Sequence, residues 1–134
     1  MRATLIHGPR DIRVQDVPDP TVQRPGDAVV KVVAACVCGS DLWPYRGTRT
    51  PESPQRIGHE FVGVVEAVGD EVSTVGPGDF VVAPFALSCG TCRHCLNGIT
   101  TSCERGLSWG SPDARGSAKS GCEALTSSFV VVRV

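Results

Sequence analysis

Four cysteines lie close together in this 134-residue sequence, at Cys89, Cys92, Cys95 and Cys103, with the spacing C-x2-C-x2-C-x7-C. Three thiols two residues apart can turn inward around one ion, and a fourth from the returning chain completes the tetrahedral ligand set of a structural Zn²⁺ site. An iron–sulfur cluster is the main alternative, but the ferredoxin run has its fourth cysteine after three residues and before a proline. Unligated thiols at this spacing would be an oxidation liability. The spacing therefore predicts structural zinc.

A second possible metal site combines Cys38 with His59 and Glu60. Cys38 closes a predicted strand, and the pair His59-Glu60 precedes another. If neighbouring strands bring them together, a thiolate and an imidazole become two of the three protein ligands that an open, catalytic zinc site needs. Each residue also has an ordinary interpretation, since a buried cysteine acts as a small hydrophobe and a single histidine as a hydrogen-bonded residue. Spacing alone leaves both interpretations open.

The elements that position these residues are predicted to be mainly β-strands. The chain has 15 glycines and 10 prolines, and aromatic residues make up 5%. Valine fills most apolar positions and fits a pleated surface, while glycine and proline separate short strands by turns. Strands are expected at residues 2–6, 12–17, 27–38, 61–68, 80–85 and 129–134.

Some of these segments carry more detailed expectations. Residues 27–38 are apolar on both faces, as a core strand would be, and include Cys36 as an ordinary strand residue. Residues 80–85 are expected to be another core strand. Ser40 or Asp41 could cap a short helical turn after the first of these strands. Residues 88–103 show no periodicity, and residues 106–121 are expected to form an exposed loop.

Composition and charge exclude several classes of function. The formal net charge is −1, which gives no support for binding nucleic acid or an anionic membrane. No apolar run approaches the roughly 20 residues that span a bilayer, and the first residues lack the apolar core of a secretory signal, so we expect a cytoplasmic protein. In a reducing cytosol, seven cysteines indicate metal ligation or catalysis rather than disulfides. The length allows one domain, and no G-x-G-x-x-G motif follows a strand.

Three further motifs accompany the cysteine lobe. The segment GHEFVG at residues 58–63 is followed by Gly69 and Val72, residues 38–41 read CGSD, and residues 77–81 read PGDFV. These motifs, and their order along the chain, resemble those of the zinc-dependent medium-chain alcohol dehydrogenases. The family's motifs are G-H-E-x2-G-x5-[GA]-x2-[IVSAC], C-G-[ST]-D and P-G-D-x-V, respectively. Phe80 replaces the usual basic residue of the last motif.

The resemblance implies a mainly β fold, a GroES-like partly open barrel with short helices and a cysteine-rich zinc lobe. It places a GroES-like alcohol dehydrogenase domain at residues 1–108, with the structural-zinc lobe at residues 88–104. Residues 109–134 then form a poorly matching C-terminal tail. We expect residues 115–134 to be non-homologous, as after a truncation or a change of reading frame.

The resemblance also implies roles for individual residues. Cys38 and His59 would be ligands of a catalytic zinc acting as a Lewis acid, and Glu60 would lie beside the metal and ligate it transiently. Ser40 would take the proton of the alcohol, and Asp41 would accept a hydrogen bond from the ring N–H of His59. The implied cofactors are Zn²⁺ and NAD(P), the implied substrate is a small-molecule alcohol or aldehyde, and the full-length family forms homo-oligomers.

Two functions remain open at this point. The family's third catalytic ligand and its NAD(P)-binding Rossmann domain are not found in these 134 residues. The expected function is therefore the zinc-binding catalytic domain of an NAD(P)-dependent alcohol dehydrogenase, inactive as an isolated fragment. The alternative is a non-catalytic, structural zinc-binding β module.

Overall fold

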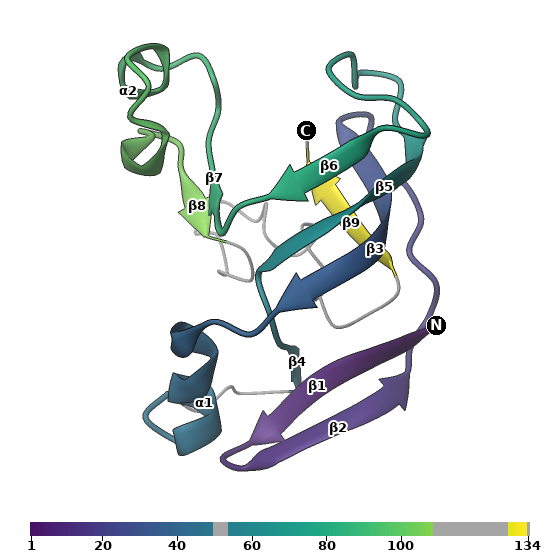
Figure 1. Cartoon of the computed structure of the whole chain (residues 1–134), viewed down its shortest axis with the longest axis vertical. Helices are drawn as coiled ribbons and strands as arrows, with labels where there is room; N and C mark the ends of the chain where they lie inside the picture. The colour runs from purple at the N-terminus through teal and green to yellow at the C-terminus, as the bar shows by residue number, and fades with distance from the viewer. Residues whose placement is uncertain (50–53, 109–128, 134) are drawn as a thin grey trace.

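The computed structural model describes residues 1–49, 54–108 and 129–133. The strands in this part of the chain are β1 (Arg2–Gly8), β2 (Asp11–Asp16), β3 (Asp27–Cys36), β4 (Gln55–Arg56), β5 (Glu60–Val68), β6 (Phe80–Ala83), β7 (Ala86–Leu87), β8 (Leu107–Ser108) and β9 (Phe129–Arg133). They form three antiparallel sheets with the orders β2-β1-β4, β6-β5-β3-β9 and β7-β8 (Figure 1). The mainly β architecture is thus confirmed.

The hydrophobic core lies in the four-stranded sheet, where β3 and β5 run side by side. Ala28 and Val30 from β3 are buried together with Phe61 and Val65 from β5. Positions two or four apart in a strand line one face of the sheet, so each of these pairs faces the same side. Partly buried side chains pack around them, from Val32, Val68, Val75, Val81 and Ala83.

At three positions of the GHEFVG motif and its continuation, the structure requires glycine, each time for a different reason. Gly58 has a φ of 96°, in the left-handed region that favours glycine. A Cβ on Gly63 would collide with the backbone of Lys31 on β3, and one on Gly69 would collide with the backbone of Pro25. The motif glycines therefore let the chain turn into β5 and let β5 approach the segments beside it.

The strand ends and their burial differ from the sequence-based expectations. β3 ends at Cys36 rather than at residue 38, and Val33 is an extra residue in a bulge opposite β5. β6 likewise ends at Ala83 rather than at residue 85. Val33 and Val82 are 64% and 70% exposed, because no described element packs on this side of β3 and β6. The prediction of two fully buried core strands is therefore wrong for the second half of β3 and for β6.

Short helices lie between β3 and β4 and between β7 and β8. They are η1 (Gly39–Asp41), α1 (Leu42–Arg46), α2 (Arg93–Leu96) and η2 (Thr100–Ser102), the first and last being 3₁₀ turns. The lobe of α2, η2, β7 and β8 projects to one side of the four-stranded sheet (Figure 1). No helix in the described residues has the length and apolar character needed to cross a bilayer.

The cap of the first turn differs from the prediction. Cys38 is the N-cap residue of η1, and Asp41 reaches back so that its Oδ2 accepts a hydrogen bond from the Cys38 N–H at 2.8 Å. Asp41 is instead the N-cap residue of α1, where its side chain makes no capping hydrogen bond, so the prediction of a cap at Ser40 or Asp41 is confirmed in position for Asp41 and is wrong for Ser40. At the other end of the chain, β9 pairs with β3, as expected for a strand that closes the sheet at residues 129–134. Residues 109–128, which include most of the predicted loop and tail, lie outside the described residues.

Candidate zinc sites

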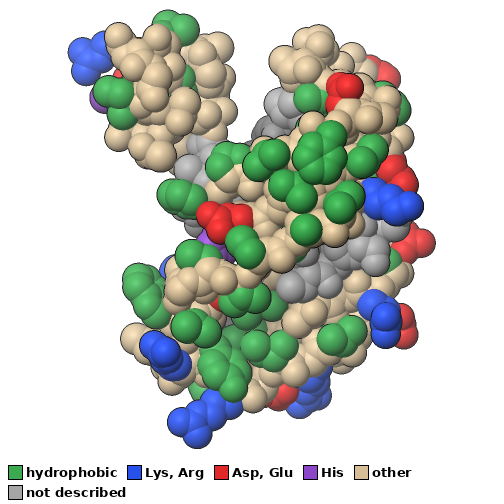
Figure 2. All heavy atoms as spheres, in the orientation of Figure 1, with side chains coloured by type: hydrophobic (Ala, Val, Ile, Leu, Met, Phe, Trp, Pro, Cys, Tyr) green, Lys and Arg blue, Asp and Glu red, His purple; other side chains and the backbone are tan. Residues whose placement is uncertain are grey.

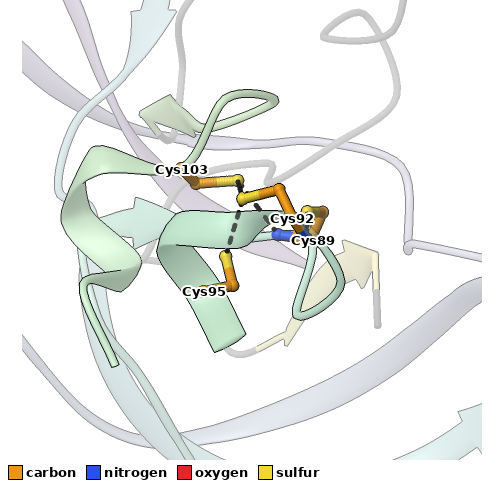
Figure 3. Close-up of side chains that lie close together, drawn as sticks. All are labelled: Cys89, Cys92, Cys95 and Cys103. Atoms are coloured by element: carbon orange, nitrogen blue, oxygen red, sulfur yellow. Dashed lines mark hydrogen bonds between the residues drawn. The ribbon is translucent and has the colours of Figure 1, made fainter. Parts of the chain in front are cut away.

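The four-cysteine lobe brings its sulfur atoms together around one point. The Sγ atoms of Cys89, Cys92, Cys95 and Cys103 all lie within 4.8 Å of one another and point inward (Figure 3). Cys92 Sγ lies 3.5 Å from Cys95 Sγ and 3.9 Å from Cys103 Sγ. Zn–S bonds of about 2.3 Å in a tetrahedron put the sulfurs about 3.8 Å apart. The donor set therefore fits Zn²⁺.

Local turns aim hydrogen-bond donors at these sulfurs. The backbone N–H of Cys92 donates to Cys89 Sγ, and those of Cys89 and Arg105 donate to Cys103 Sγ, each at 3.3 Å. The Thr91 hydroxyl also donates to Cys89 Sγ, at 3.5 Å. Donors to sulfur favour the thiolate, which is the form that binds a metal.

The thiols of the lobe ionise at different pH. Hydrogen bonds, first of all from Thr91, lower the pKa of Cys89 to about 5. Burial and then a hydrogen bond with Cys92 raise the pKa of Cys95 to about 11. The metal-free lobe thus holds at least one thiolate and at least one thiol at neutral pH, and loading with zinc must release protons.

The second candidate site is organised by Asp41, which is 8% exposed. Its Oδ1 lies 3.3 Å from His59 Nδ1 and accepts a hydrogen bond from the Gly58 N–H, also at 3.3 Å. Its Oδ2 accepts from the Cys38 N–H. One carboxylate therefore ties the start of η1 to the residues before β5. With Nδ1 donating to Asp41, His59 Nε2 keeps its lone pair for another partner.

Ser40 and Cys38 lie near the other nitrogen of the same ring. Ser40 Oγ is 3.3 Å from His59 Nε2. Hydrogen bonds from the backbone and then the hydroxyl of Ser40, followed by His59, lower the pKa of the Cys38 thiol. The structure thus brings together two donors of the three that a catalytic zinc needs. In the described part of the chain, the four-cysteine lobe is the one group of three or more metal donors close enough to share an ion.

Glu60 follows His59 in sequence, but its carboxylate contacts a residue that sequence reasoning missed. Glu60 Oε2 lies 3.1 Å from Cys36 Sγ, and this hydrogen bond is the main cause that raises the pKa of the Cys36 thiol. The sequence analysis interpreted Cys36 as an ordinary strand residue. The C-x-C spacing of Cys36 and Cys38 could have indicated it, since residues two apart on an extended chain face the same side.

The chain is similar to known alcohol dehydrogenases in both sequence and structure. The alcohol dehydrogenase GroES-like domain family matches residues 24–133. Zinc-type alcohol dehydrogenase B of Aspergillus flavus is 40% identical over 110 residues, which are 82% of this chain and 26% of that protein. A medium chain reductase/dehydrogenase of Acremonium sp is 49% identical over 96 residues, 71% of this chain and 33% of that protein. The solved structure of alcohol dehydrogenase TADH from Thermus sp. ATN1 has a TM-score of 0.81 at 39% identity, covering 99% of this chain and 37% of that one.

The chain belongs to the alcohol dehydrogenase GroES-like domain family. The resemblance to zinc-type alcohol dehydrogenases and the GroES-like fold are therefore confirmed. The chain spans 26% and 33% of the lengths of the two curated relatives. The family match extends to residue 133, so the expectation that residues 115–134 are non-homologous is wrong. The division into a domain at residues 1–108 and a tail at residues 109–134 stays a prediction.

Proposed function

We propose that this chain is the zinc-binding catalytic domain of an NAD(P)-dependent alcohol dehydrogenase, with Cys38 and His59 as ligands of a catalytic zinc. The observation that carries the proposal is the His59 ring, whose Nδ1 and Nε2 lie 3.3 Å from Asp41 Oδ1 and Ser40 Oγ. A zinc-binding histidine needs an acceptor on its other nitrogen, because that acceptor sets the tautomer and orients the ring. The four-cysteine lobe would hold a separate, structural zinc.

Each residue of this site has a distinct task in the proposal. Cys38 and His59 would hold a zinc ion, which would supply a Lewis acid for an alcohol or carbonyl oxygen. Ser40 Oγ, which lies beside the ligand nitrogen of His59, would take the proton of a small-molecule alcohol while passing its own hydroxyl proton on to water, as the first step of a relay. Asp41 holds the imidazole in the tautomer that leaves Nε2 unprotonated. Glu60 is the neighbouring carboxylate that can move to the metal when ligands exchange.

The described residues do not fit a nicotinamide dinucleotide. All their strand pairings are antiparallel, whereas a dinucleotide-binding unit has parallel strands, a crossover helix and a glycine-rich turn. We therefore derive no step through NAD(P). We expect the isolated chain to show no NAD(P)-dependent alcohol oxidation, even when it is loaded with zinc.

Zinc content tests the proposed catalytic site. Protein purified from zinc-supplemented cells is expected to hold two zinc ions per chain, and His59→Ala is expected to hold one. His7→Ala is the matched control with two zinc ions, because the His7 ring bonds to Gln15 at 2.6 Å on the β1–β2 hairpin. A wild-type chain with one zinc, carried by the lobe, would contradict the proposal.

One observation favours the alternative, a non-catalytic zinc-binding β module. Within the described residues, only the lobe assembles a full set of metal donors, and Cys38 with His59 supplies two. A single zinc that survives His59→Ala unchanged would support this function. The metal content of the two proteins thus separates the proposals without an activity assay.

The proposed setting is the cytoplasm, with a small alcohol or aldehyde as substrate and a homo-oligomeric full-length enzyme. All cysteines in the described residues are free thiols, which suits a reducing compartment. The net charge of −1 gives no support for nucleic acid or anionic lipid as a partner.

A further inference from the structure

Two neighbouring contacts link the end of β3 to the start of β5. Cys38 lies beside Ser40 and His59, and hydrogen bonds from Ser40 and then from His59 lower the pKa of its thiol, whereas Cys36 lies beside Glu60. Cys36 and Cys38 are two residues apart, and Glu60 directly follows His59, so the two contacts are neighbours. The first contact holds the proposed zinc ligands, and the second holds the carboxylate next to them.

The bulge in β3 creates the contact between Cys36 and Glu60. Before the bulge Val32 pairs with Gly63, and after it Ala34 pairs with Val62, so Cys36 comes to face Glu60. Without the extra residue at Val33, Ala35 would face Glu60 instead. A glutamate beside the proposed metal site therefore faces a thiol rather than a methyl group.

Within the described part of the chain, the Cys36 thiol is the one hydrogen-bond donor to the Glu60 carboxylate. Cys36 and Glu60 line an open groove of about 370 Å³, and the rest of its wall is apolar, from Ala34, Ala35, Phe61, Val62, Val82, Ala83 and Pro84. Figure 2 shows hydrophobic side chains gathered over this part of the sheet. The contact is exposed and a thiol is a weak donor, but the ionised carboxylate strengthens the hydrogen bond that it accepts.

We propose that Cys36 is a positioning residue, whose thiol holds the Glu60 carboxylate on the β3 side and away from the metal position at Cys38 and His59. The inference rests on the proposed function, because it needs a metal at that pair. Carboxylates bind Zn²⁺ readily, so a released Glu60 would add a third protein donor. Removing the Cys36 thiol would then tighten zinc binding at this site, whereas removing a true ligand would weaken it.

The test compares the dissociation constant of the second zinc among variants whose lobe is already loaded. Competition with a chromophoric chelator is measured for wild type, Cys36→Ala, Cys36→Ser and the double variant Cys36→Ala/Glu60→Gln. Cys36→Ala is expected to lower the dissociation constant roughly tenfold, at the low end of effects from residues that support metal ligands. Cys36→Ser keeps a donor and is expected to match wild type within about twofold.

The double variant separates positioning from a general structural effect. An amide is a poor zinc ligand, so Glu60→Gln should abolish the gain produced by Cys36→Ala. An unchanged or raised dissociation constant in Cys36→Ala would overturn the inference while leaving Cys38 and His59 as ligands. A second zinc whose binding is unaffected by Cys38→Ala, or absent from both wild type and Cys36→Ala, would instead overturn the proposed function and the inference with it.

Discussion

At the residue scale, the second site depends on the two oxygens of one buried carboxylate. Asp41 accepts hydrogen bonds from the backbone N–H groups of Cys38 and Gly58, which belong to different segments. Losing the acceptor would leave two partly buried donors unpaired, and an unpaired buried donor costs about 1–3 kcal/mol. Asp41→Ala is therefore expected to lower the free energy of unfolding by about 2 kcal/mol in urea denaturation. It should also remove the second zinc, as measured by metal analysis.

Asp79 offers the matched control for this prediction. Its Oδ2 also accepts a backbone hydrogen bond within a turn, from the Gly76 N–H at 2.8 Å, but the residue is exposed. Water can replace the acceptor there, so Asp79→Ala should cost less than about 1 kcal/mol and leave zinc content unchanged. Equal losses of stability in Asp41→Ala and Asp79→Ala would show that the Asp41 network does not hold the site together.

The thiol pKa values of the lobe set how zinc binding depends on pH. Zinc binds thiolates, so a cysteine that is protonated in the metal-free chain must lose its proton on binding. The pKa of Cys95 is raised to about 11 by burial, and that of Cys89 is lowered to about 5, with the Thr91 hydroxyl as the main cause. From pH 8 down to pH 6, Cys95 alone should weaken binding about tenfold per unit. Cys89 should add its own dependence only near pH 5 and below.

Chelator competition across this pH range measures the dissociation constant, and calorimetry in two buffers counts the released protons. Thr91→Val removes the hydroxyl that donates to Cys89 Sγ. The proton count at pH 6 should then rise, because Cys89 would be more fully protonated before it binds zinc. A dissociation constant that stays constant between pH 8 and pH 6 would contradict the raised pKa of Cys95.

At the element scale, the pairing of β3 with β5 requires glycine at defined positions. A Cβ on Gly63 would meet the backbone of Lys31, and a Cβ on Gly69 the backbone of Pro25. Backbone cannot move aside as a flexible side chain can, so Gly63→Ala and Gly69→Ala should each destabilise the chain by about 2–3 kcal/mol. Thermal or urea unfolding measures this loss.

Gly76→Ala is the matched substitution in open space, since nothing lies within 4 Å of a Cβ built there. Its backbone is not in the left-handed region, so the change should alter stability by less than about 1 kcal/mol. If Gly63→Ala were as well tolerated, the strands would not be as closely apposed as the structure has them.

The same two strands show what the sequence could and could not predict. The lobe was predictable because its four cysteines lie in one short segment, and local turns bring them together. The bulge at Val33 was not, because strand register is decided by pairing between segments distant in sequence. The contact of Cys36 with Glu60 depends on that register, and so a residue interpreted as ordinary strand became part of the site. Valine at position 82 indicated burial, but it is 70% exposed in the described structure.

At the scale of the whole molecule, the lobe and the four-stranded sheet are stabilised by different interactions. The sheet has a buried apolar core on β3 and β5. In the described part of the lobe, between residues 88 and 106, no hydrophobic side chain is buried, and Leu96 and Ile99 are 74% and 51% exposed. Figure 2 shows the lobe set off from the body of the molecule by a notch. Because no apolar side chain is buried between residues 88 and 106, we expect zinc coordination to hold this part of the lobe together.

This division predicts that loss of zinc from the lobe unfolds it without unfolding the sheet. In Cys103→Ser, or after chelation, amide hydrogen exchange should accelerate at least tenfold across residues 89–105, because binding energy at a structural zinc is folding energy. Amides of β3 and β5 should keep their protection, since their hydrogen bonds belong to a separate core. Cys36→Ser is the control cysteine on β3 and should leave both regions protected. Simultaneous loss of protection in lobe and sheet would mean instead that zinc stabilises the domain as one cooperative unit.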